Sequence, residues 1–112
     1  LRIIADKEQV SRVFINLIKN SVQAIPSDIE GKITIELIEE KNRAVITIKD
    51  NGNGIPEDRK ERLFEPSFTT KTTGMGIGLA IVKNIVNSAG GDIWFESKLG
   101  KGTKFFVEFL KV

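Results

Sequence analysis

The sequence predicts an α+β domain in which one β-sheet is covered on one face by helices. Two stretches carry apolar residues at helical spacing, and four stretches alternate between apolar and polar residues in two consecutive pairs. Neighbouring alternating stretches are typical of antiparallel hairpins, and helices with one apolar face bury that face against a sheet. The 112 residues suit one domain, so we assign residues 1–112 to a single folded unit.

The first long helix has a recognisable beginning and end. Asp6 is a candidate N-cap, and Gln9, three residues later, completes a capping box. Apolar residues recur at helical spacing as far as Ile25, and Pro26 ends the helix. The face predicted to be buried consists of Val10, Val13, Phe14, Leu17, Ile18, Val22 and Ile25.

The expected strands are 1–4, 32–38, 43–49, 92–97 and 103–110. In the first hairpin, Ile33, Ile35, Leu37, Ala44, Ile46 and Ile48 are expected to share one side of the sheet.

The helical segments between the hairpins are less regular. Residues 56–63 fit a short helix, and Phe64–Gly74 lack periodicity, so we expect a mobile loop there. A second long helix begins at Gly76 or Gly78 and runs to about Ala89, where two glycines cap it.

Composition excludes several classes of function. The chain has no histidine and no cysteine, so it contains no Ser-His-Asp triad, no Cys-His pair and no histidine to be phosphorylated. Its formal net charge is +2 with scattered Lys and Arg, which gives nucleic-acid binding no electrostatic support. No apolar run approaches about 18 residues, so we expect no membrane contact by this domain.

An uncharged amide stripe lies beside the apolar face of the first helix. At about 100° per residue, Gln9, Asn16 and Asn20 fall within roughly 40° of one another. Asn16 and Asn20 are one turn apart, so their amides can converge on one ligand. Because Asn is a mediocre helix former, two of them beside the apolar face favour a ligand-binding role. Two solvated side chains without a ligand are an equally good interpretation of the stripe taken alone.

Two inward-facing polar residues fit a ligand site. Asp50 is in phase with Ile46 and Ile48, so its carboxylate is predicted to point toward the helices, where it needs a partner. Thr103 is in phase with Phe105, and its hydroxyl is expected within reach of Asp50 or a ligand. The alternative interpretations are an ordinary Asp-Gly turn and a structural threonine.

A glycine-rich segment, Gly74-Met75-Gly76-Ile77-Gly78, precedes the second long helix. It presents backbone N–H groups at the positive end of a helix, which is a natural phosphate site. Its spacing matches neither a Walker loop nor a Rossmann fingerprint, and a simple glycine hinge is the alternative.

Short motifs in one order resemble the ATP-binding domain of the family that contains histidine kinases, Hsp90-type chaperones, type II topoisomerases and MutL proteins. Asn16–Ser21 is similar to the N box, Asp50–Ile55 to the G1 box and 74–82 to the G2 box. Residues 63–71 (LFEPSFTTK) resemble the F box, which is particular to histidine kinases, and 100–105 resemble the final Gly-Thr-x-Phe segment. The resemblance spans the whole chain.

The resemblance implies a Bergerat-type fold: a two-layer α/β sandwich in which about three helices cover one face of a mixed, mostly antiparallel sheet of about five strands. It also implies binding of ATP or ADP with Mg²⁺. Asn20 would ligate the metal with Asn16 beside it, and Asp50 would accept a hydrogen bond from the adenine amino group. Lys71, in the lid 64–75, is the candidate γ-phosphate contact, so Asn16 and Lys71 are the candidate catalytic residues. The other implied nucleotide-binding residues are Gly52, Gly54, Ile55, Thr70, Gly74, Met75, Gly76, Ile77, Gly78, Leu79 and Thr103.

Within this family the resemblance implies a protein-histidine kinase. Hydrolysing relatives have a Glu one turn before the metal-binding Asn, where it serves as a general base, and here that position is Asn16. The γ-phosphoryl group would pass to a histidine on a dimerisation domain of the same protein. A response-regulator receiver domain is the expected further partner, in the cytoplasm. A nucleotide-sensing module without transfer, a serine kinase of the anti-sigma-factor type and a gyrase- or chaperone-type ATPase are the alternatives.

Two positions depart from the usual motifs. Ser21 stands where the family usually has Ala, a small-for-small exchange from which we expect no loss. Ser67 lies between Pro66 and Phe68, a form of the F box that resembles the nitrogen-regulator-like subgroup.

Overall fold

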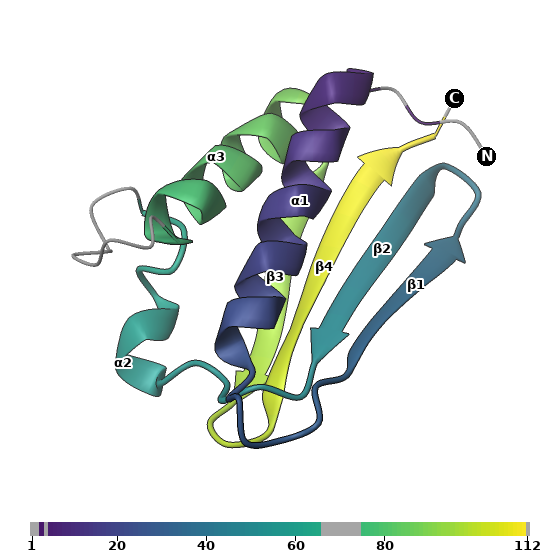
Figure 1. Cartoon of the computed structure of the whole chain (residues 1–112). Coiled ribbons are helices and arrows are strands. Elements are labelled where there is room, and N and C mark those ends of the chain that lie inside the picture. Colours follow the sequence, from purple (N-terminus) through teal and green to yellow (C-terminus); the bar gives the residue numbers. More distant parts are fainter. Residues whose placement is uncertain (1–2, 4, 66–74, 112) are drawn as a thin grey trace.

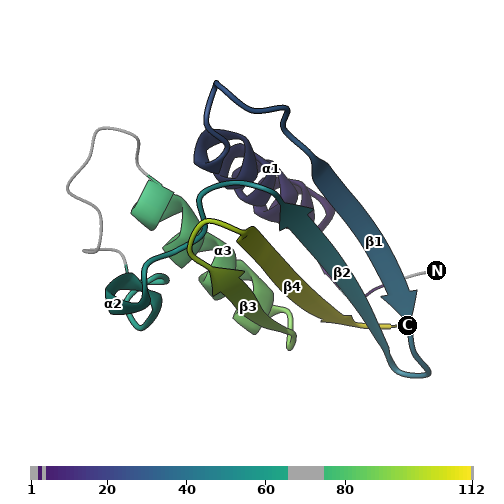
Figure 2. The same cartoon turned by 90° about the horizontal axis from the view of Figure 1, so that it is seen from below.

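The computed structural model describes residues 3, 5–65 and 75–111, and of Met75–Ile77 the backbone alone. Its two layers are an antiparallel sheet in the order β1-β2-β4-β3 and helices packed on one face of that sheet (Figures 1 and 2). The strands are β1 (Ile33–Glu39), β2 (Arg43–Asp50), β3 (Asp92–Lys98) and β4 (Gly102–Leu110), and the helices are α1 (Lys7–Ala24), α2 (Glu57–Lys60) and α3 (Met75–Ser88).

The predicted α+β sandwich is confirmed, with a smaller sheet. Every strand pairing among the described residues is antiparallel, and four strands are formed rather than about five. The N-terminal segment contributes a single bridge between Ile3 and Lys111. Residues 1–2 and 4 of the expected first strand lie outside the described part of the chain.

The core lies between the two long helices and the centre of the sheet. Each helix contributes the face that its periodicity predicts, with Val13 and Leu17 from α1 and Val82 and Val86 from α3 fully buried. They pack on Ile48, Phe105, Val107 and Phe109 of β2 and β4. Each fully buried aliphatic or aromatic side chain contributes about 1.5–3 kcal/mol to stability, so this cluster fixes the position of α1 against α3.

The apolar side of the edge strand β1 is largely exposed, and the end of α1 is less buried than predicted. Val22 is 57% exposed, and Ile35 and Leu37 are also more than half exposed. The cause is the placement of α1, which packs over β2 and β4 and leaves the edge strand β1 uncovered. The prediction that Val22 is buried is therefore wrong, whereas Ile35 and Leu37 share one side of the sheet with Ile48 and Ile46 as predicted.

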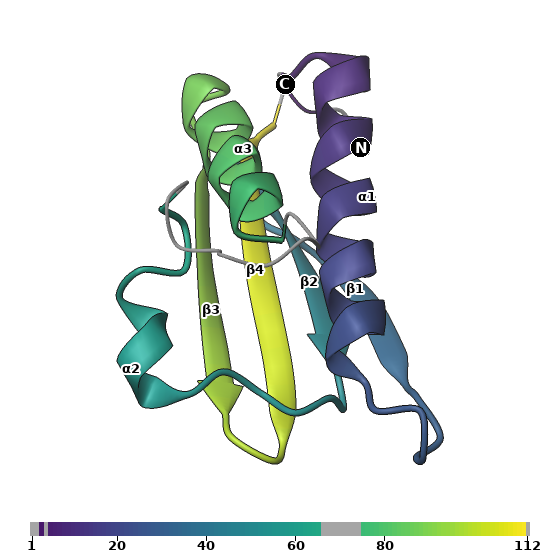
Figure 3. The same cartoon turned by 60° about the vertical axis from the view of Figure 1, so that its left-hand side comes forward.

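Helix α2 is shorter than the predicted 56–63 and continues as hydrogen-bonded turns to residue 65. The chain leaves β2, crosses the end of β4 and reaches α2 beside β3 (Figure 3). Lys60 Nζ donates to the Ser97 carbonyl at 2.6 Å, which ties α2 to β3. Phe64 packs edge-on against Phe95, with ring centroids 5.9 Å apart. Phe64 therefore belongs to the packed structure and not to the predicted loop, of which residues 66–74 lie outside the described residues.

Helix α3 begins and ends within one residue of the predicted Gly76 and Ala89. It begins at Met75, one residue before Gly76, and ends at Ser88. Gly90 adopts a φ of +78°, and the Gly91 N–H donates to the Val86 carbonyl at 3.0 Å. This arrangement is the glycine cap that the sequence predicts.

Ser21 lies in the N-box motif of α1, and its hydroxyl is buried without a partner among the described residues. A buried hydroxyl without a hydrogen bond costs about 1–3 kcal/mol. We expect Ser21→Ala to raise the free energy of unfolding by about 1 kcal/mol, as urea denaturation can measure. Ser11→Ala, at an exposed position of the same helix, controls for the higher helix propensity of Ala. A Ser21→Ala variant no more stable than Ser11→Ala would contradict this assignment.

Candidate functional site

A cavity of about 210 Å³ lies where α1, the segment after β2, α2, α3 and β4 meet. Its polar lining residues include Asn20, Asp50 and Thr103, with Asn53 and Arg59 at the side of the segment after β2 and α2, and its apolar walls are formed by Ile55, Leu63, Leu79 and Phe105. Drug-sized ligands occupy about 300–1,000 Å³, so this cavity fits a heterocyclic base better than a whole nucleotide. It brings together Asn20, Asp50, Gly54, Ile55, Leu79 and Thr103, which the sequence assigns to the nucleotide site.

Asp50 is the last residue of β2 and points into the helix-covered side, as its phase with Ile48 predicts. It is only 3% exposed. Its Oδ1 accepts a hydrogen bond from the Gly52 N–H at 2.8 Å. No described residue donates to Oδ2, so this oxygen is open to a donor in the cavity. Burying a carboxylate with one short-range partner is costly, which favours a ligand group that donates here.

The segment after Asp50 is held between α1 and the β3–β4 hairpin. The Asn53 N–H donates to the Ala24 carbonyl at 2.9 Å, and the Gly100 N–H donates to the Asn53 carbonyl at 2.6 Å. Gly54 has a φ of +77°, and a Cβ there would lie 2.3 Å from the Lys98 carbonyl oxygen. Only glycine meets both conditions. Gly54 therefore permits close packing on the hairpin, and it also lines the cavity.

Thr103 is 5% exposed and stands directly opposite Asp50 in the β2–β4 register. The sequence places its hydroxyl near Asp50 or a ligand, but its partner among the described residues is Ser97, whose Oγ lies 2.8 Å from Thr103 Oγ1. Ser97 is a site residue that the sequence analysis missed. The signal was present in the predicted hairpin, because Ser97 and Thr103 face each other across β3 and β4.

The two asparagines of α1 lie one turn apart along the side that faces α3. Asn20 is 8% exposed, and its amide forms no hydrogen bond within the described part of the chain. Asn16 Nδ2 donates to the Arg12 carbonyl at 2.9 Å. Its Oδ1 is turned toward α3, where a Cβ on Gly78 would lie 3.1 Å from it. Asn16 therefore presents its amide oxygen between α1 and the first turn of α3, while Asn20 lines the cavity one turn further along α1.

The remaining predicted residues lie in and before the first turn of α3. Thr70, Lys71 and Gly74 are outside the described residues. The helix begins at Met75, so the backbone N–H groups of Met75, Gly76 and Ile77 belong to the turn that lacks intrahelical acceptors. The N-terminus of α3, whose free N–H groups the sequence predicts as a phosphate site, therefore lies beside Asn16.

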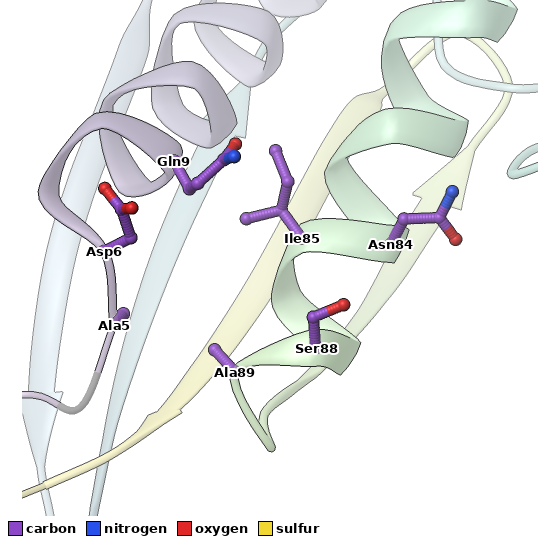
Figure 4. A pocket seen from close by; sticks show the side chains of 7 residues that line it. All are labelled: Ala5, Asp6, Gln9, Asn84, Ile85, Ser88 and Ala89. Atoms are coloured by element: carbon purple, nitrogen blue, oxygen red, sulfur yellow. The ribbon is translucent and has the colours of Figure 1, made fainter.

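A larger cavity of about 540 Å³ lies at the opposite end of the α1–α3 pair (Figure 4). Gln9 points into it from α1, opposite Ile85 of α3. With Gln9 in this orientation, the predicted capping box is incomplete. The Asp6 side chain accepts a hydrogen bond from the Glu8 N–H at 2.9 Å, but among the described residues the Gln9 side chain accepts none from the Asp6 N–H. None of the predicted nucleotide-binding residues that the structure describes lines this cavity, and its Asp6 already caps α1, so we place the site at the smaller cavity with Asp50.

The fold places two long helices on one face of an antiparallel sheet, with a buried carboxylate in a cavity between the layers. The family model described as histidine kinase-, DNA gyrase B- and HSP90-like ATPase matches residues 5–112. The chain belongs to this family.

Similar proteins of known class are sensor kinases. The sensor histidine kinase ZraS of Salmonella typhi is 43% identical over 107 residues, which are 95% of this chain and 23% of ZraS. Sporulation kinase C of Bacillus subtilis is 39% identical over 102 residues, which are 91% of this chain and 23% of that kinase. The chain thus spans 23% of the length of each of these two relatives.

Solved structures agree with this class. The catalytic domain of histidine kinase ThkA superposes with a TM-score of 0.84 at 36% identity, covering 96% of this chain and 70% of that one. Full-length ShkA in complex with AMPPNP gives a TM-score of 0.82 at 27% identity, covering 98% of this chain and 23% of that one. The predicted Bergerat-type fold and the histidine-kinase catalytic domain are thereby confirmed. No helix in the described part has the length and apolarity to cross a membrane.

Proposed function

We propose that this chain binds ATP with Mg²⁺ and donates the γ-phosphoryl group to a histidine on a separate dimerisation domain of the same protein. The observation that carries the proposal is Asp50, a buried carboxylate with one internal donor at the polar end of a base-sized cavity. The ShkA structure, which contains an ATP analogue, and the sensor kinases among the relatives support it.

Asp50 selects the base. A carboxylate only accepts hydrogen bonds, so its open oxygen pairs with the amino group of adenine. A guanine base in the same orientation would place a carbonyl oxygen against it, and neither acceptor would be satisfied. The apolar side chains of Ile55, Leu79 and Phe105 enclose the faces of the base.

The two asparagines fit a magnesium ion shared with the phosphates. Among the described residues no group of three or more His, Cys, Asp or Glu side chains could hold a metal. Mg²⁺ keeps several waters and is bound through a few protein oxygens plus substrate phosphates. Asn20, buried and without a partner in the described part, would supply one oxygen, and Asn16 would lie beside it. The ion would neutralise charge on the triphosphate.

Asn16 also explains why transfer to a protein is favoured over hydrolysis. An amide cannot take a proton from water as a carboxylate general base does. Phosphoryl transfer depends on positioning and charge stabilisation around an in-line nucleophile, and the sequence contains no histidine to supply that nucleophile. The acceptor histidine therefore belongs to another domain, consistent with the chain spanning 23% of ZraS.

The lid and the partners complete the proposal. Thr70, Lys71 and Gly74, together with the first turn of α3, would surround the phosphates, with Lys71 on the γ-phosphate. The phosphorylated histidine would pass its phosphoryl group to a response-regulator receiver domain. The domain would act in the cytoplasm, where ATP is available.

Titration calorimetry of Asn20→Asp tests the proposal. Without Mg²⁺ the added carboxylate repels the phosphates, and with Mg²⁺ it becomes a ligand. We therefore expect the ratio of ATP affinities with and without Mg²⁺ to rise by about tenfold, which is about 1.4 kcal/mol. Asn87→Asp, an exposed site on α3, controls for the charge change alone. A wild-type magnesium ratio in folded Asn20→Asp would argue against the metal role.

A further inference from the structure

We propose that Ser97 is a positioning residue that fixes the direction of the Thr103 hydroxyl, so that Asp50 and Thr103 present a pair of acceptors to the cavity and prefer adenine to 6-oxo purines. The inference rests on the proposed nucleotide-binding function. Ser97 does not line the base cavity itself, whereas Thr103 does. Any effect of Ser97 on base choice must therefore pass through a neighbour that does line the cavity, and its two such neighbours among the described residues are Thr103 and the Ile55 backbone.

Ser97 Oγ meets three groups from three segments of the chain. The Ile55 N–H donates to it at 2.8 Å. It lies 3.0 Å from the Gly102 carbonyl oxygen and 2.8 Å from Thr103 Oγ1. These contacts link the segment after β2 to both strands of the β3–β4 hairpin.

A serine hydroxyl has one hydrogen and two lone pairs, which determines how these contacts are filled. The Ile55 N–H occupies one lone pair. The Gly102 carbonyl can only accept, so that contact uses the Ser97 hydrogen. The Thr103 hydroxyl must then donate to the second lone pair of Ser97. One assignment satisfies all three contacts, and it commits the Thr103 hydrogen to Ser97.

The consequence appears at the base end of the cavity. Thr103 retains two lone pairs and no free hydrogen, so it acts toward the cavity as an acceptor. Asp50 stands directly opposite Thr103 in the β2–β4 register and is also an acceptor. Two neighbouring acceptors match the two hydrogens of the adenine amino group. The 6-oxo group of hypoxanthine offers no hydrogen and meets two acceptors.

The Ser97→Ala variant tests this inference with ATP and inosine triphosphate as probes. Without Ser97, the Thr103 hydroxyl can rotate and donate into the cavity, so a 6-oxo group gains a partner. We expect the ratio of ATP to inosine triphosphate affinity to fall about tenfold, as one reversed hydrogen bond corresponds to about that factor. Ser97→Thr keeps a hydroxyl and should keep the wild-type ratio. If Ser97→Ala does not fold, Ser97→Cys, with a weakly hydrogen-bonding thiol, should lower the ratio relative to Ser97→Thr.

A double-mutant cycle with Thr103→Val separates positioning from a general structural role. In the Val background no hydroxyl remains to be redirected, so adding Ser97→Ala should leave the ratio unchanged. Equal weakening of both nucleotides by Ser97→Ala would overturn the inference, as would a tenfold fall of the ratio that persists in the Val background. Asp50→Ala separates failure of the proposed function from failure of the inference about Ser97. If ATP binding does not depend on Asp50, the proposed function fails. If binding depends on Asp50 but the ratio ignores Ser97, only the inference fails.

Discussion

Replacing Asp50 by alanine should weaken ATP binding by roughly 10- to 100-fold, because a charge-assisted hydrogen bond contributes about 1.5–3 kcal/mol. In the folded domain this carboxylate is 3% exposed and keeps one oxygen open to the cavity. The substitution also removes the internal bond to the Gly52 N–H. Part of the loss will therefore come from a looser segment after β2.

Titration with a fluorescent adenine nucleotide measures this effect. Thermal unfolding of the variant establishes that it is folded. Asp58→Ala, which removes an exposed carboxylate from α2, controls for the change in net charge. An unchanged dissociation constant in folded Asp50→Ala would refute the assignment of Asp50 to adenine.

Local patterns predict on which face of its helix or strand each candidate polar residue lies. Asp50 and Thr103 were assigned to the inner face from period-2 alternation, and both are buried there. Asn16 and Asn20 were assigned to one side of α1 from the 100° helical rotation, and both face α3 or the cavity. These assignments succeed because the direction of a side chain in a regular element depends only on its position along that element.

Long-range placement could not be predicted in the same way. Alternation assigns Ile35 and Leu37 to one side of the sheet, but it does not say which strands lie under a helix. Because α1 covers β2 and β4, the inner side of β1 stays exposed. The same cause exposes Val22 at the end of α1.

The hydroxyl network is a second example of information that the sequence pattern lacks. Ser97 joins Ile55, 42 residues away, to Gly102 and Thr103. The hairpin register predicts the Ser97–Thr103 pair, but only the tertiary fold brings the Ile55 N–H to the same oxygen. The glycine at position 54 similarly belongs to a contact with the Lys98 carbonyl that depends on the folded hairpin.

The isolated chain should bind ATP and Mg²⁺ but neither label itself nor release phosphate quickly. Phosphoryl transfer requires a nucleophile in line with the γ-phosphate, and the chain contains no histidine. Its lid threonines, at positions 69, 70, 72 and 73, have no base assigned to activate them. The amide at Asn16 does not activate water. Transfer should appear only when a domain bearing the acceptor histidine is supplied.

The most direct measurement incubates the chain with γ-labelled ATP and Mg²⁺, alone and together with the histidine-bearing dimerisation domain of its own full-length protein. We predict no label on the chain in either case. We predict label on the added domain, with the acid lability and base stability of a phosphoramidate. Strong self-labelling of the chain alone would indicate a Ser/Thr kinase, and rapid release of phosphate would indicate an ATPase. Either result would contradict the proposed histidine-kinase function.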